Sequence, residues 1–227
     1  VVVSNFKGLG VEWGAYEDTN KLKEDYWDVT TRAVDRLAPQ LVRCMVSYDW
    51  FVKNLNKGPL DEKGNNIDLN DDTWEYDFNN KWMKSACEIL EYCVEHDIDV
   101  AFGAWNPVGN VNPELDEWGM IPNVTADIRW AKMTVDVLTY LVKVKGYTCI
   151  KYFVNSNEPN YTGFKGQSKN AYNTYEVWEQ GVKNVRKALD DDGLNEIDIV
   201  GGDTTGAEGC KEYLPNIAKN LKDIVHN

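Results

Sequence analysis

The chain has 227 residues, of which 43% are hydrophobic, and carries a formal net charge of −13 at pH 7. This composition predicts one large domain over residues 1–227 with a sizeable core, and no segment resembles a linker. The negative charge argues against nucleic acid or an anionic membrane surface as a partner, because both would repel it. No apolar run approaches the roughly 18 residues of a membrane-spanning helix.

Five short apolar runs recur along the chain, and a segment of helical periodicity follows each of them. The runs cover residues 9–13, 41–46, 98–103, 149–154 and 197–202. The helices are expected at 29–37, at 82–93, from about Thr125 as N-cap to 141, from about 168 or 170 to 189, and at 210–225. Gly146 and Gly193 provide stop signals, and Pro39 ends the first helix. The polar segment 53–80 is expected to be a long loop, with a hairpin near 63–66.

This alternation predicts an α/β fold with parallel strands joined by right-handed crossovers. Two architectures fit: an open doubly wound sheet and an incomplete (β/α)8 barrel. A doubly wound domain usually carries a glycine-rich phosphate turn after its first strand. The segment that follows the first run here, 12–16, holds an acid and two aromatic residues around a single Gly14, so it is a poor phosphate cradle.

Polar and aromatic residues end every predicted strand. In a barrel, the carboxyl ends of the strands form the active-site face, so these side chains would converge there. Aromatic rings at strand ends suit stacking on sugars, and the chain has nine Trp and twelve Tyr. The strand ends are Glu12-Trp13, Tyr48-Asp49-Trp50, Trp105-Asn106, Asn157-Glu158 and Asp203-Thr204-Thr205.

The fourth run ends in Asn157-Glu158-Pro159, and this arrangement resembles the fourth strand of the clan A (β/α)8-barrel glycoside hydrolases. The resemblance implies that Glu158 is the general acid/base and that Asn157 is a sugar-binding amide. Arg43 matches an Arg that the clan often places in its second strand. Only the tripeptide is a specific motif, and no single family within the clan stands out.

The third strand end completes the resemblance, because the clan often ends that strand with a pair such as Trp105-Asn106. As further substrate-binding candidates we take Trp13, Glu12 and Trp50. The implied reaction is retaining hydrolysis of β-linked sugars, in which two carboxyl groups about 5 to 5.5 Å apart act as acid/base and nucleophile. The expected partner is an oligosaccharide, a polysaccharide or another glycoside.

The clan's nucleophile is a Glu at the end of the seventh strand, whereas this chain is predicted to stop after the fifth βα unit. We therefore expect a (β/α)8 barrel of which this chain is the N-terminal part, inactive by itself as a retaining hydrolase. The open strand edges of a genuine half barrel would favour self-association.

A catalytically inactive carbohydrate-binding barrel fragment is the alternative function. Such a fragment would keep the aromatic rim. Each residue also has a purely structural interpretation: Glu158 as a surface glutamate in a turn, Arg43 as the partner of a buried acid, and Trp13, Trp50 and Trp105 as packing residues. A third hypothesis is an unrelated β/α enzyme. Its expected sequence feature would be a phosphate-binding or metal-binding motif.

No cofactor or metal is expected. The five cysteines form no C-x-x-C pair and the two histidines form no zinc motif, so neither a zinc site nor a disulfide framework is predicted. The chain starts at Val1 rather than Met, which suggests a removed upstream segment. Secretion is favoured slightly over the cytoplasm, although the location stays open.

Overall fold

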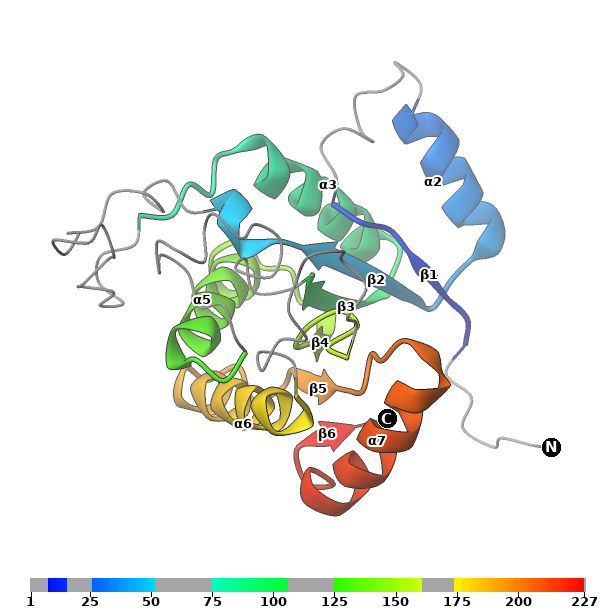
Figure 1. The fold of residues 1–227 in the computed structure, drawn as a ribbon. Coiled ribbons are helices and arrows are strands. Elements are labelled where there is room, and N and C mark those ends of the chain that lie inside the picture. Colours follow the sequence, from blue (N-terminus) through cyan, green and yellow to red (C-terminus); the bar gives the residue numbers. More distant parts are fainter. Residues whose placement is uncertain (1–7, 16–25, 52–74, 106–124, 161–173, 227) are drawn as a thin grey trace, which may run out of the picture.

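The computed structural model describes residues 8–15, 26–51, 75–105, 125–160 and 174–226, except the side chains of Tyr48 and Asp49. Within these residues, six parallel strands form one sheet in sequence order, β1 to β6. Figure 1 shows the strands side by side, with α2 next to β1 and α7 next to β6. The strands are β1 (Gly10–Glu12), β2 (Leu41–Val46), β3 (Asp99–Ala104), β4 (Ile150–Val154), β5 (Asp198–Val200) and β6 (Val225–His226).

A helix lies between each pair of consecutive strands, which confirms the predicted α/β alternation. These helices are α2 (Tyr26–Leu37), α3 (Lys81–Glu95), α5 (Ile128–Thr139), α6 (Tyr175–Asp191) and α7 (Gly206–Asn220). A 3₁₀ turn, η1 (Tyr48–Phe51), follows β2, and a π-helical turn, η4 (Tyr140–Val144), extends α5. The predicted stop signals are confirmed, because Gly146 and Gly193 take positive φ angles of 79° and 67°.

Several helix boundaries differ from the sequence prediction, and those of α5 and α7 differ for clear physical reasons. The N-cap of α5 is Asp127, whose carboxylate accepts the N–H of Arg129 at 2.9 Å, whereas Thr125 is buried and packs under α6. Helix α7 ends at Asn220 rather than continuing to 225. Val225 instead pairs with Ile199 as part of β6, a strand that the sequence did not predict.

The beginning of α6 is capped by Thr174, whose hydroxyl accepts the N–H of Val177 at 3.3 Å. The predicted start near 168 or 170 and the predicted hairpin at 63–66 lie outside the described residues. Asn80 caps α3 by accepting the N–H groups of Trp82 and Met83. Local side-chain hydrogen bonds therefore fix where these helices begin.

The main core lies between the sheet and the helices. It contains the strand residues whose side chains face the helices, such as Phe102 and Phe153. Three cysteines of this core, Cys44, Cys93 and Cys149, are buried and act as small hydrophobic residues. Burial raises the pKa of Cys149 to about 11, so its thiol stays uncharged. No disulfide joins the cysteines.

The opposite face of the sheet, here called the inner face, carries a second and smaller core. Met45, Ala101 and Val154 are buried there. Gly103 lies among them, and a Cβ added at Gly103 would meet Met45 Sδ at 2.6 Å and Val154 Cβ at 2.8 Å. The strands are thus packed tightly on this face too. Leu41, Trp105, Tyr152 and Val200 pack around the three buried residues.

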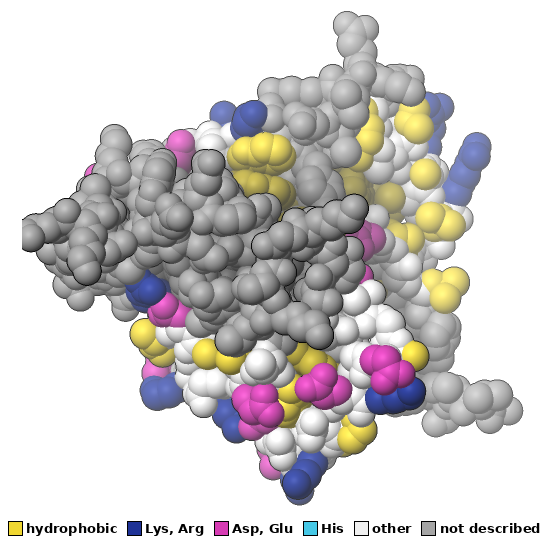
Figure 2. Space-filling model, in the orientation of Figure 1, with side chains coloured by type: hydrophobic (Ala, Val, Ile, Leu, Met, Phe, Trp, Pro, Cys, Tyr) yellow, Lys and Arg dark blue, Asp and Glu magenta, His cyan; other side chains and the backbone are white. Residues whose placement is uncertain are grey.

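On the face of the molecule that Figure 2 shows, acidic side chains are scattered over the described residues, with Lys and Arg among them. Among the described helices, none is long and apolar enough to cross a membrane.

Candidate active site

Arg43 is the centre of a polar cluster at the carboxyl end of the sheet. It projects from β2, and its register partner on β1 is Glu12. Arg43 Nη1 donates to Glu12 Oε2 at 2.7 Å. Its Nη2 donates to Asn157 Oδ1 at 2.7 Å and to Asp203 Oδ2 at 2.6 Å. One guanidinium therefore joins residues that follow or end β1, β4 and β5, and we call these four residues the Arg43 cluster.

The Arg43 side chain is 22% exposed. Burial opposes its positive charge, but the carboxylates of Asp203 and Glu12 outweigh that effect and raise the pKa of Arg43. The guanidinium also lies over the ring of Trp105, with Cζ 5.7 Å from the ring centroid. Arg43 is thus a fixed cation, held by charge on two sides and by an aromatic ring.

The turn after β4 positions Asn157 and Glu158. The backbone N–H of Asn157 lies 3.0 Å from the carbonyl oxygen of Ala104 and 2.9 Å from that of Trp105, which ties this turn to the end of β3. The next residue, Glu158, has a positive φ of 38°. A residue before proline is normally extended, and a non-glycine residue in the left-handed region is strained, so the fold holds Glu158 in a costly conformation.

Replacing Glu158 by Gly is expected to raise the free energy of unfolding by up to about 1 kcal/mol, because glycine adopts a positive φ without strain. Glu158→Ala is the matched control, since it removes the same carboxylate but keeps the Cβ that causes the strain. Urea unfolding followed by circular dichroism measures both. Equal stabilities for the Gly and Ala variants would contradict the prediction.

The two residues that directly precede this turn, Asn155 and Ser156, are buried. Asn155 is 1% exposed, and its Oδ1 accepts the indole N–H of Trp130 at 3.0 Å. Asn155 Nδ2 and the hydroxyl of Ser156 are buried without a hydrogen-bond partner among the described residues. Folded chains usually satisfy such groups, so exceptions often mark functional positions.

A second contact ties this turn to the loop that follows β5. Asn160 Nδ2 donates to the carbonyl of Thr205 at 2.7 Å, and Asn160 Oδ1 accepts the N–H of Thr205 at 2.9 Å. Gly209 in α7 allows this approach, because a Cβ there would lie 2.1 Å from Asn160 Nδ2. The loop that carries Asp203 is therefore fixed against the turn that carries Glu158.

The predicted site residues separate into those that the structure brings together and those that it does not. Arg43, Glu12 and Asn157 belong to the Arg43 cluster, Trp105 lies beside it, and Glu158 follows Asn157 in the chain. Asn106 lies outside the described residues.

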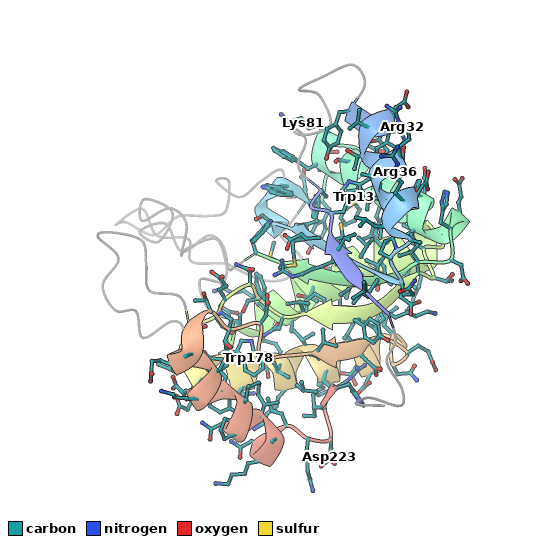
Figure 3. All side chains as sticks on the ribbon, turned by 90° about the vertical axis from the view of Figure 1, so that its right-hand side faces the viewer. Trp13, Arg32, Arg36, Lys81, Trp178 and Asp223 are labelled. Carbon is teal, nitrogen blue, oxygen red and sulfur yellow. The ribbon has the colours of Figure 1, made fainter. Side chains whose placement is uncertain are left out.

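Two predicted aromatic residues lie elsewhere. Trp13 is 4% exposed and lies between β1 and the helices, with ring centroids 5.3 Å from Trp27 and 5.4 Å from Tyr92 (Figure 3). Trp50 stacks on Trp82 with a centroid distance of 4.5 Å. Both rings take part in packing between the sheet and its outer elements.

Asp203 is the residue to which the sequence analysis gave no role, although its place at a strand end was noted. Its side chain is 35% exposed and makes the shortest of the three Arg43 contacts. The assembled groups are carboxylates, an amide, a guanidinium and an aromatic ring. This set suits a neutral polar ligand with many hydroxyl groups, and no cluster of metal-binding side chains occurs among the described residues.

Comparisons with known proteins agree with this architecture. No family model matches the sequence, and no curated protein sequence does either. Solved structures do match. SrfJ from Salmonella typhimurium has a TM-score of 0.65 at 15% identity, over 98% of this chain and 50% of that chain. The endo-β1,6-glucanase BT3312 has a TM-score of 0.61 at 16% identity, over 96% of this chain and 50% of that one.

A family 39 glycoside hydrolase from Bacteroides cellulosilyticus WH2 also matches, with a TM-score of 0.53 at 15% identity, over 96% of this chain and 36% of that chain. The fold is that of part of a (β/α)8 barrel, like the corresponding part of these solved structures. The chain spans half the length of these structures or less. The predicted resemblance to the barrel glycoside hydrolases is thereby confirmed at the level of the fold, and this partial barrel is glycosidase-like in architecture.

Proposed function

We propose that this partial barrel supplies the acid/base half of a retaining glycoside hydrolase for β-linked sugars, with Glu158 as the acid/base. The observation that carries the proposal is the Arg43 cluster, which brings Asn157 to the carboxyl end of a parallel sheet directly before a conformationally strained Glu158. Carbohydrates are the expected ligands, and a secreted location suits such a substrate.

In the proposed reaction, Glu158 gives its proton to the glycosidic oxygen as the bond to the anomeric carbon breaks. A second carboxylate attacks the anomeric carbon and forms the glycosyl–enzyme bond. Glu158, now ionised, takes a proton from water, whose oxygen displaces that carboxylate and restores both groups. We propose that the second carboxylate comes from outside this chain, since this chain covers only 36% and 50% of the two matched glycoside hydrolases.

Sugar binding by this chain is the direct test. We expect at least one β-linked oligosaccharide from a panel of glucans, xylans and mannans to bind, measured by calorimetry. Trp105→Ala is expected to weaken that binding by about tenfold, because an aromatic platform contributes roughly 0.5–1.5 kcal/mol beyond buried area.

Trp50→Phe is the matched control, because its ring stacks on Trp82 rather than beside Arg43. Its affinity should equal that of the unaltered chain. Failure of every sugar in the panel to bind would contradict the proposal. Binding without turnover in the full-length protein would favour the inactive carbohydrate-binding barrel instead.

A further inference from the structure

We propose that Asp203 is a positioning residue: it holds Arg43 in place, and Arg43 in turn fixes the side-chain amide of Asn157 with its NH₂ group toward the ligand. This inference rests on the proposed function, because it assumes that Asn157 contacts the sugar. Asp203 follows β5, and its carboxylate lies 2.6 Å from Arg43 Nη2.

The orientation of the Asn157 amide follows from the chemistry of arginine. A guanidinium has only donors, so the atom of Asn157 that lies 2.7 Å from Arg43 Nη2 must be the oxygen. The amide is planar, with Nδ2 on the side away from Oδ1. Asn157 therefore offers two N–H donors to a ligand, and the ligand atom that it contacts must be an acceptor oxygen.

The same nitrogen of Arg43 serves both Asn157 and Asp203. Nη2 carries two hydrogens, so it can donate one to Asn157 Oδ1 and one to Asp203 Oδ2. The bond to the carboxylate is charge-assisted and the stronger of the two. Asp203 therefore determines where Nη2 lies, and the neutral amide of Asn157 aligns with it.

Glu12 acts on the opposite side of the guanidinium. It accepts from Nη1 at 2.7 Å, and its side chain is 46% exposed compared with 35% for Asp203. The two carboxylates, one on β1 and one after β5, attract Arg43 from both sides. Without Asp203, Glu12 would be the one carboxylate among the described residues bonded to the guanidinium, which would move toward β1 and away from Asn157.

The test uses the 227-residue chain, labelled with ¹⁵N, and four variants. In Asp203→Ala, we expect the side-chain NH₂ signals of Asn157 to shift or broaden and the affinity for a bound β-linked oligosaccharide to fall about tenfold, equivalent to 1.4 kcal/mol. Asp203→Asn keeps an acceptor for Nη2 and should restore most of both properties. Asp191→Ala, which removes an exposed carboxylate that pairs with Lys187 on α6, is the control and should leave the Asn157 signals and the affinity unchanged.

Asn157→Asp is the complementary variant, because it keeps an acceptor for Arg43 but removes the NH₂ donors. We expect it to fold and to lose affinity. Unchanged Asn157 signals in a folded Asp203→Ala chain would overturn the proposal, as would equal losses of affinity in Asp203→Ala and Asp191→Ala. If the unaltered chain binds no sugar, the proposed function fails, while the Asn157 signals still decide the role of Asp203.

Discussion

Glu158→Gln is expected to lower kcat on a β-glycoside with an ordinary alcohol leaving group by about 10²–10⁴-fold, in a full-length protein that carries this chain. Glutamine has nearly the shape of glutamate but cannot give a proton to the glycosidic oxygen. The strained backbone at this position stays the same, since both residues carry a Cβ. The loss therefore reports on the chemistry of the carboxyl group rather than on the conformation of the turn.

The leaving group separates this role from a binding role. A nitrophenolate leaves without protonation, so the loss in kcat/KM should be much smaller for a nitrophenyl glycoside than for an alkyl glycoside. Glu95→Gln, at the exposed end of α3, is the control and should leave both values unchanged. An equal loss for both leaving groups would show that Glu158 does not act as the acid.

The strands could be predicted because buried parallel strands produce continuous apolar runs between amphipathic helices. The short β6 escaped prediction, because a pair of residues such as 225–226 creates no pattern of its own. Helix starts were less certain for a physical reason. Thr125 and Asp127 are both good caps, and only packing against α6 decides that Thr125 is buried instead.

Side-chain alternation explains which of the predicted site residues lie in the Arg43 cluster. Neighbouring residues in a strand point to opposite faces, so Glu12 and Trp13 could not both reach the same site. Glu12 contacts Arg43, and Trp13 enters the outer core. This signal was present in the sequence and would have removed Trp13 from the candidates.

Side-chain alternation does not predict that Asp203 faces Arg43. Val200 belongs to the inner face, so strict alternation would put residue 202, rather than 203, on that face. Gly202, however, has a positive φ of 88°, which breaks the regular strand and turns Asp203 toward Arg43. The sequence shows Gly202 but not its positive φ angle. The contact between Asp203 and Arg43 therefore became evident only in the structure.

The second large expected effect concerns Trp130, whose indole N–H donates to Asn155. Trp130→Ala is expected to lower the free energy of unfolding by about 3–5 kcal/mol, because Trp130 is fully buried and its removal leaves a large cavity. Trp130→Phe fills most of that space but removes the N–H that Asn155 Oδ1 accepts. Its expected cost is about 1–3 kcal/mol, the penalty for a buried acceptor left without its donor.

Because Asn155 directly precedes Ser156 and Asn157, the Phe variant should also disturb the turn. Chemical denaturation measures the stability, and ¹⁵N spectra of the Asn157 backbone amide, which faces the Ala104 and Trp105 carbonyls, measure the disturbance. Trp82→Phe is the control, since that partly buried ring stacks on Trp50 and lies outside the Arg43 cluster. If Trp130→Phe weakened stability but left the Asn157 amide unmoved, Trp130 would support the core alone, and the ties to β3 and Asn160 would suffice to hold the turn.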